Sequence, residues 1–254
     1  MGTGAEVDES DHQAARRIAA GTAETLMAVR AQVGFADPAA LRAAGDARAE
    51  ERIQALLAEL CPGQAVLSEE SADDRARLDA SRVWIVDPLD GTREFSEEGR
   101  DDFAVHVALV VAEQPVCGAV ALPARGAVYS TGEQTPVVPP SGAGRPRIAV
   151  SRTRPPALVD ALAGRLGADV LPMGSAGVKV ISVVVGEVDL YVHAGGQYEW
   201  DSAAPVAVAL AAGLHASRVD GSPLRYNQAE PSLPDLVVCR PELADSVLEA
   251  LAGG

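Results

Sequence analysis

The chain has 254 residues, of which 48% are hydrophobic and 22% charged, and its formal net charge is -15 at pH 7. This length can bury a substantial core, either in one large domain or in two fused subdomains. The negative charge argues against a general nucleic-acid-binding surface, which requires clustered basic residues. A small anionic ligand remains compatible with it, because divalent cations bound to an acidic cluster reverse the local electrostatics.

Cysteines and apolar segments exclude further classes. Cys61, Cys117 and Cys239 lie far apart and form no Cys-x-x-Cys or Cys/His cluster, so neither a zinc site nor a disulfide framework is indicated. No apolar run approaches the ~18 residues of a membrane span. The acidic N-terminus does not resemble a secretion signal. We therefore expect a soluble cytoplasmic protein that has no membrane partner.

Two long helices are predicted at the start of the chain. The first covers residues 10–33, with Ser10 as a candidate N-cap, and residues 34–38 end it. The second opens at Gly45-Asp46 and stops at Cys61-Pro62-Gly63. An acid at a helix start is most often a simple N-cap, and this is the ordinary interpretation of Asp46.

Two short apolar segments that end in acids follow. Residues 65–67 predict a strand that leads into Ser68-Glu69-Glu70, and residues 83–86 predict a buried strand that stops at Asp87. Pro88 cannot extend a ladder and Gly91 favours a turn, so we expect the strand to end here. Taken alone, this end is equally compatible with a solvated Asp-Gly turn and with a site for Mg²⁺, which prefers oxygen ligands in tight geometry.

The remaining pattern predicts two subdomains. Strands at residues 103–111, 115–122 and 127–130 indicate a largely antiparallel middle region, and His106 within the first of them is expected to be structural. The proline-rich residues 133–146 are the best candidate boundary, which separates an N-terminal subdomain, residues 1–145, from a C-terminal one, residues 146–254. In the latter, strands and helices alternate, which predicts an α/β layer with buried strands.

Carboxylates thus stand at three separate strand ends or helix starts: Glu69, the pair Asp87 and Asp90, and Asp201. Two Mg²⁺ ions roughly 3.5–4 Å apart can share one carboxylate, and Asp87 is placed to be that bridge. The main-chain carbonyl of Leu89 is a further candidate ligand. Gly91 would let a phosphate oxygen approach the backbone closely. Thr92 and Asp46 supply a hydroxyl and a base that could orient a water molecule.

These motifs resemble those of the inositol monophosphatase superfamily, which comprises lithium-sensitive, Mg²⁺-dependent phosphomonoesterases. Asp87-Pro88-Leu89-Asp90-Gly91-Thr92 and Trp200-Asp201-Ser202-Ala203-Ala204 are similar to its two signatures, and Leu67-Ser68-Glu69-Glu70-Ser71 to its first acidic motif. The resemblance implies an α/β (α+β) fold, a layered αβαβα sandwich. It also implies two or three Mg²⁺ ions and in-line attack by an activated water, without a covalent intermediate.

Residue roles follow from the resemblance. The implied metal ligands are Glu69, Asp87, the Leu89 carbonyl, Asp90 and Asp201, and the implied catalytic residues are Asp46, Thr92 and Glu69. Residues 35–41 depart from the polar run that the inositol phosphatases carry before Asp46. The two-ion chemistry is therefore implied more strongly than a third ion or lithium sensitivity.

One branch of the superfamily is closer than the others. Arg93-Glu94-Phe95 follows Gly91-Thr92, where inositol monophosphatases typically read Thr-Asn-Phe, and this is similar to the CysQ-like 3'(2'),5'-bisphosphate nucleotidases of the actinobacterial type. The implied reaction is hydrolysis of the 3'-phosphate of 3'-phosphoadenosine 5'-phosphate, and also of its 5'-phosphosulfate form. The expected substrate contacts are Glu69, Leu89, Asp90, Gly91, Thr92, Arg93, Gly174, Ser175, Lys179, His193, Asp201 and Tyr226.

Other interpretations stay open on the sequence. The metal core is shared with inositol-1-phosphatases and fructose-1,6-bisphosphatases, so it does not discriminate among these substrates. A catalytically silent metal- or nucleotide-binding sensor is disfavoured because the acids and Thr92 are all present. An acidic Ca²⁺-binding structural protein lacks the expected EF-hand loop. The oligomeric state is not determined by the sequence, and a homodimer is one expectation.

Overall fold

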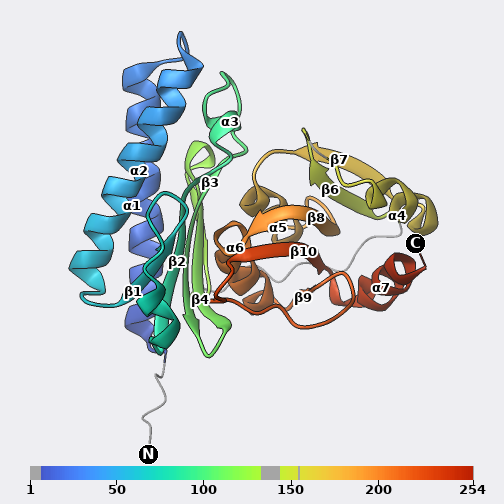
Figure 1. Ribbon diagram of the computed structural model, residues 1–254. Helices are drawn as coiled ribbons and strands as arrows, with labels where there is room; N and C mark the ends of the chain where they lie inside the picture. The colour runs from blue at the N-terminus through green and yellow to red at the C-terminus, as the bar shows by residue number, and fades with distance from the viewer. Residues whose placement is uncertain (1–6, 133–143, 154, 254) are drawn as a thin grey trace, which may run out of the picture.

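The computed structural model describes residues 7–132, 144–153 and 155–253, which form a layered αβαβα sandwich (Figure 1). Helices α1 (Glu9–Val33) and α2 (Pro38–Leu60) cover one face of the first sheet. Helices α5 (Ala176–Val184) and α6 (Glu199–Ala211) lie between the two sheets, and α4 (Leu158–Leu166) and α7 (Ala244–Ala252) pack on the outer face of the second. The predicted layered fold is confirmed.

The first sheet has the strand order β1-β2-β3-β4-β5. Its strands are β1 (Ala65–Ser68), β2 (Arg82–Asp90), β3 (Ala104–Val111), β4 (Gln114–Leu122) and β5 (Ala127–Ser130). Among the described residues of this sheet, β1 and β2 pair in parallel and the other neighbours pair antiparallel. Because strand side chains alternate between faces, Trp84 and Val86 pack toward α1 and α2, whereas Val83 and Ile85 pack toward α5 and α6. Asp87 continues this second face.

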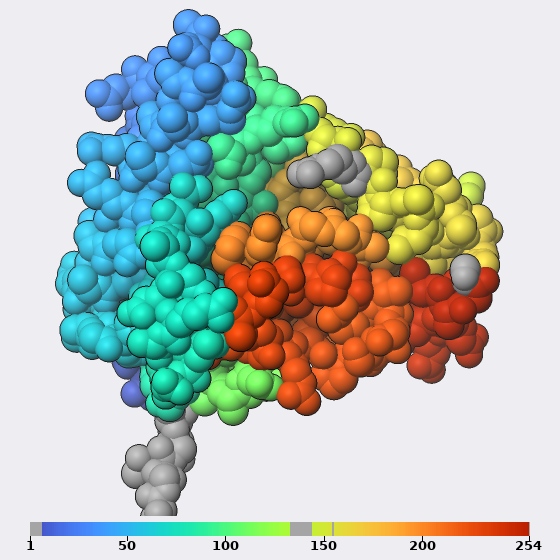
Figure 2. All heavy atoms as spheres, in the orientation of Figure 1, coloured from blue at the N-terminus to red at the C-terminus, as the bar shows by residue number. Residues whose placement is uncertain are grey.

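The second sheet has the order β7-β6-β8-β10-β9. Its strands are β6 (Arg147–Ser151), β7 (Asp169–Met173), β8 (Leu190–Tyr198), β9 (His215–Ser217) and β10 (Ser232–Cys239). Strand β6 runs parallel to β7 and β8, and β10 runs antiparallel to β8 and β9. The predicted boundary at residues 133–146 lies largely outside the described residues, and the two sheets stand on either side of it. Figure 2 shows the segments of the two halves in direct contact.

The described part of the chain also contains short helices: η1 (Arg75–Asp79), α3 (Thr92–Phe95), η2 (Pro123–Arg125) and η3 (Pro241–Leu243). Helix η1 falls within a segment that lacks any sequence signal for a strand or a long helix.

Within the described ranges, no helix combines the length and the apolarity that crossing a bilayer requires.

Both N-terminal helices begin differently from the sequence prediction. Helix α1 is capped by Asp8 and not by Ser10, because Asp8 and Asp11 form a reciprocal capping box. Helix α2 begins well before Gly45: the Asp37 side chain accepts from the amides of residues 39 and 40, and Pro38 occupies the first turn, where its missing N–H costs nothing. Asp46 is therefore an interior helical residue, and its N-cap interpretation was wrong.

Strand β2 also runs further than predicted. It continues through Pro88 to Asp90 because its register with β3 shifts between Asp87 and Asp90. An irregularity of this kind leaves a residue unpaired, so the missing amide hydrogen of Pro88 is tolerated. The shift re-aims the chain beyond Asp87, where the acids are concentrated.

Candidate active site

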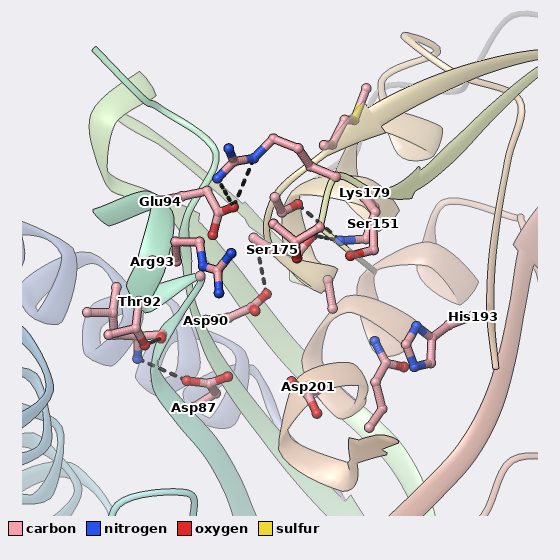
Figure 3. A pocket seen from close by; sticks show the side chains of 18 of the residues that line it. Asp87, Asp90, Thr92, Arg93, Glu94, Ser151, Ser175, Lys179, His193 and Asp201 are labelled. Carbon is pink, nitrogen blue, oxygen red and sulfur yellow. Dashed lines mark hydrogen bonds and ion pairs between the residues drawn. The ribbon is translucent and has the colours of Figure 1, made fainter. Parts of the chain in front are cut away.

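Three carboxylates from the two halves of the chain meet at one end of the layers. Asp87 and Asp90 come from the end of β2 and Asp201 from the first turn of α6, and one carboxylate oxygen of each lies within 4.8 Å of the others. Together with Glu69, which follows β1, they line a pocket of about 280 Å³ (Figure 3). We call these four residues the acidic floor.

The acidic floor carries charge that the protein itself does not balance. Burial, together with repulsion by Glu69 and Asp90, raises the pKa of Asp87 well above its usual range. Desolvation and neighbouring carboxylates raise the pKa values of Glu69 and Asp201 to about 7. Oxygen Oδ2 of Asp87 is buried and has no hydrogen-bond partner among the described residues. An all-oxygen donor set with these properties fits a hard divalent cation.

Asp46 and Thr92 face each other beside this floor. Thr92 Oγ1 lies 3.4 Å from Asp46 Oδ1 and 3.1 Å from the Leu89 carbonyl oxygen. A Cβ at Gly45 would lie 2.6 Å from the Phe95 ring, so glycine at this position is what lets α2 approach α3 closely enough for the contact. Burial, reinforced by Glu70, raises the pKa of Asp46 to about 6. A carboxyl with that pKa beside a hydroxyl suits proton transfer near neutral pH.

The turn between Asp87 and Thr92 is held in one conformation. The Leu89 amide donates to Asp87 Oδ1 at 2.9 Å, which shapes the turn around Asp87. Gly91 adopts φ 88°, a left-handed conformation that other residues rarely take, and a Cβ there would lie 3.2 Å from the Asp102 carbonyl oxygen. Glycine is therefore required both for the backbone conformation and for space.

The loop that leads into α5 closes over Asp90. Ser175 Oγ donates to Asp90 Oδ2 at 2.5 Å and the Gly177 amide at 2.8 Å, while the Gly174 amide donates to Asp102 Oδ2 at 2.6 Å. Ser175 has φ 46°, an uncommon conformation for a residue with a side chain. Because the Ser175 hydroxyl donates its hydrogen to Asp90, it cannot donate the same hydrogen to a ligand.

Cationic side chains form the opposite wall of the pocket. Lys179 is buried, and its Nζ donates to the carbonyls of Gly174 and Ser175. Arg152 forms ion pairs with Glu94 at 2.8 Å and Glu97 at 3.0 Å, and both carboxylates raise the pKa of its guanidinium. Arg93 is exposed and lies along the pocket between Thr92 and the Ser175 loop (Figure 3). We call Arg93, Arg152 and Lys179 the cationic wall.

The model of the inositol monophosphatase family matches residues 5–252. The chain belongs to the inositol monophosphatase family. A relative from Mycobacterium tuberculosis, named 3'-phosphoadenosine 5'-phosphate phosphatase, is 55% identical to this chain. The match covers 89% of this chain and 88% of the relative. The Escherichia coli relative, named 3'(2'),5'-bisphosphate nucleotidase CysQ, is 34% identical over 75% of this chain and 81% of the relative.

A solved structure agrees with this family membership. The crystal structure of CysQ from Bacteroides thetaiotaomicron, described as a bacterial member of the inositol monophosphatase family, superposes with a TM-score of 0.78 at 26% identity. The match covers 91% of this chain and 97% of that one. The resemblance inferred from the sequence motifs is confirmed.

Most of the residues singled out from this family member's sequence do line the pocket. These are Glu69, Asp87, Leu89, Asp90, Gly91, Thr92, Arg93, Gly174, Ser175, Lys179, His193 and Asp201. Asp46 does not line the pocket, but it extends from α2 and contacts Thr92. Tyr226 is the exception: its side chain is completely buried and its hydroxyl lies 3.2 Å from Ser202 Oγ. The prediction that Tyr226 contacts the substrate was wrong, because its ring belongs to the core between the layers.

Sequence reasoning missed two groups of residues. Ser151, Arg152 and Thr153 line the pocket where β6 ends. Ligands in α/β sheets gather at the carboxyl ends of parallel strands, and that rule could have indicated them. The complete burial of His106 and its contact with the Trp200 carbonyl agree with the structural role predicted for it, but its position against the acidic floor, where burial lowers its pKa, was not predicted. Within its strand, an isolated histidine carried no signal of this location.

Proposed function

We propose that this protein is a Mg²⁺-dependent phosphatase that removes the 3'-phosphate of 3'-phosphoadenosine 5'-phosphate, giving AMP and phosphate. The single observation that carries the proposal is the acidic floor, where four carboxylates converge around the buried Asp87, placed directly beside the Thr92–Asp46 pair. The mycobacterial relatives that carry the corresponding name support the choice of substrate.

The acidic floor would hold the ions. Glu69, Asp87 and Asp90, with the Leu89 carbonyl and Asp201, supply oxygen ligands from both halves of the chain. Bound Mg²⁺ ions would neutralise these acids, polarise the phosphate and stabilise the leaving oxygen. Without them, the floor would repel a phosphate group, so the proposal requires metal dependence.

Thr92 and Asp46 would handle the attacking water. The Thr92 hydroxyl orients the water toward the phosphorus, and Asp46 takes up the proton that the water loses as it attacks. The P–O3' bond breaks as the new P–O bond forms, and the released 3'-oxygen is protonated from solvent. Amide groups at Gly91 and Thr92 are placed to contact the transferred phosphate, since Gly91 carries no side chain to block it.

The second phosphate of the substrate would lie toward the cationic wall. Arg93 is exposed along the pocket, whereas Lys179 and Arg152 are tied to carbonyls and carboxylates. Arg93 is therefore the wall residue with most freedom to form a charge-assisted contact with a ligand. A 5'-phosphosulfate also carries negative charge in this position, so we propose it as a second substrate.

A panel of phosphate-release assays tests the proposal. It compares adenosine 3',5'-bisphosphate, its 5'-phosphosulfate form, inositol 1-phosphate and fructose 1,6-bisphosphate, each with Mg²⁺, with EDTA and with added Li⁺. We expect kcat/KM to be at least about 10-fold higher for the bisphosphorylated nucleotide than for the inositol or sugar phosphates, and activity to be lost in EDTA. Equal turnover of inositol 1-phosphate would contradict the assigned substrate, and full activity in EDTA would contradict the metal dependence.

A further inference from the structure

His106 joins the two halves of the acidic floor. It lies in β3, opposite Asp87 in the register with β2, and it is completely buried on the face that packs toward α5 and α6. Its Nδ1 lies 3.0 Å from the carbonyl oxygen of Trp200, and its Nε2 lies 3.3 Å from Asp90 Oδ2. One ring therefore touches the segments that carry Asp90 and Asp201.

The partners of the ring determine how it acts. A carbonyl oxygen only accepts hydrogen bonds, so Nδ1 must carry a hydrogen and donate it to Trp200. That carbonyl belongs to the peptide unit whose nitrogen is that of Asp201, so the bond holds the first turn of α6. In the tautomer that carries its hydrogen on Nδ1, Nε2 has none to donate, so its approach to within 3.3 Å of Asp90 Oδ2 is a packing contact and not a hydrogen bond. The ring is rigid, and it therefore keeps these two contacts at a constant separation.

Gly177 provides an independent sign that the ring position matters. A Cβ at this residue would lie 2.1 Å from Nε2 of His106, closer than any side chain permits. The φ of Gly177 is not in the left-handed region, so glycine is needed here for space and not for backbone conformation. Its amide also donates to Asp90 Oδ2. Helix α5 thus begins directly against the ring, and both touch the same carboxylate.

We propose that His106 is a positioning residue that sets the spacing between the Asp90 and Asp201 carboxylates, and thereby the affinity of the acidic floor for divalent cations. The inference rests on the proposed function, because it assumes that the floor binds Mg²⁺. Residues that orient metal ligands without binding the metal typically change metal affinity by about 10- to 100-fold when they are replaced.

Two substitutions separate the two contacts of the ring. In His106→Asn the amide nitrogen stands near the place of Nδ1, so it keeps the bond to Trp200 but not the approach to Asp90. In His106→Gln the amide reaches the place of Nε2 and keeps the opposite contact. Because both contacts are needed, we expect Mg²⁺ binding to the metal-free protein, measured by calorimetry, to weaken by about 10-fold in each variant. KM for the nucleotide at saturating Mg²⁺ should stay within about twofold.

A control variant and a double-mutant cycle distinguish a role of His106 in positioning the carboxylates from a role in the stability of the fold. His215→Asn alters a histidine that contacts Ser217 in β9 and does not line the pocket, and it should leave Mg²⁺ affinity unchanged. Gly177→Ala keeps the imidazole but displaces it, so it should weaken Mg²⁺ binding in the unsubstituted protein. In the His106→Asn background the same methyl group meets a shorter side chain, and its effect should largely disappear.

The outcomes are distinguishable. Mg²⁺ affinity within about twofold of the unsubstituted protein in both His106 variants would overturn the positioning role, and so would additive effects of Gly177→Ala and His106→Asn. A fall in melting temperature without a loss of Mg²⁺ affinity would likewise assign His106 to the core alone. Failure of the unsubstituted protein to bind Mg²⁺ would overturn the proposed metal-dependent function, and this inference with it.

Discussion

The acidic floor and the cationic wall face each other across one pocket, but they balance their charges differently. In the wall, Arg152 is paired with Glu94 and Glu97, and Lys179 donates to main-chain carbonyls. In the floor, burial and mutual repulsion raise the pKa values of Asp201 and Glu69 to about 7. Two of the three cations of the wall therefore have partners within the protein, whereas the clustered carboxylates of the floor are relieved of their repulsion when protons or cations bind.

Under the proposed function, the floor would carry out the chemistry and the wall would select the substrate. Glu94 is buried, and its Cγ leaves no room for a Cβ at Gly174, so it shapes the loop before α5 as well as holding Arg152. Its neighbour Arg93 is left exposed to the pocket. The neighbours Arg93 and Glu94 thus have separate roles. Glu94 shapes the site from within, and Arg93 is exposed toward a substrate.

Replacing a floor carboxylate should have the largest effect. Asp87→Asn keeps the shape of the side chain but removes the negative charge of a proposed metal ligand, and we expect Mg²⁺-dependent phosphate release to fall by about 10³-fold or more. Because the Asp87 carboxylate is buried and repelled by its neighbours, the metal-free variant should melt at the same temperature as the unsubstituted protein or higher. Kinetics and thermal melts check both parts, and retained turnover would show that Asp87 is not a metal ligand.

The Thr92–Asp46 pair should rank second. Thr92→Val removes the hydroxyl but keeps the volume, and kcat should fall by about 10²-fold because proton transfer from the water is impaired. Mg²⁺ affinity measured by calorimetry should not change, since neither residue is assigned to the floor. Thr25→Val, which alters a hydroxyl on α1 bonded to the Gly21 carbonyl, is the matched control. An equal loss of kcat in the control would contradict a specific role of the Thr92 hydroxyl in catalysis.

The wall should affect substrate choice more than rate. Arg93→Ala should raise KM for adenosine 3',5'-bisphosphate by about 10-fold, the loss of one charge-assisted contact, and leave KM for inositol 1-phosphate within about twofold. Steady-state kinetics with both substrates measure the difference. Arg48→Ala, in an exposed ion pair with Glu51 on α2, is the control. An equal rise in KM for the two substrates would show that Arg93 does not contact the second phosphate.

The pH dependence of stability should show the smallest effect. Glu69 and Asp201 have folded-state pKa values of about 7, raised from 4.5 and 3.8, so the folded metal-free protein binds more protons than the unfolded chain. Its stability should therefore fall as pH rises from about 4 to 7. Bound Mg²⁺ offsets this repulsion, so the Mg²⁺-induced rise in melting temperature should be greater at pH 8 than at pH 5. Melts across that range test it, and a pH-independent rise would contradict the unbalanced floor.

The amino-acid sequence alone was enough to predict the buried strands near residues 65–67 and 83–86, the acids next to them and the family, although β2 extends further than predicted. Apolar runs, turn residues and the Asp87 to Thr92 motif are local features, because strand formation and turn geometry depend on neighbouring residues in the chain. This is why Glu69, Asp87, Asp90 and Asp201 could be singled out before their spatial relation was known.

The directions of several side chains became known only from the packing of the layers. Asp46 reaches Thr92 from inside α2 because Gly45 packs against Phe95, and Tyr226 turns into the core instead of toward a ligand. His106 contacts the acidic floor because β3 pairs with β2 in the first sheet, and both strands present this face to the layer of α5 and α6. Such contacts join residues far apart in the chain and depend on how layers pack, which no local pattern of residue types specifies.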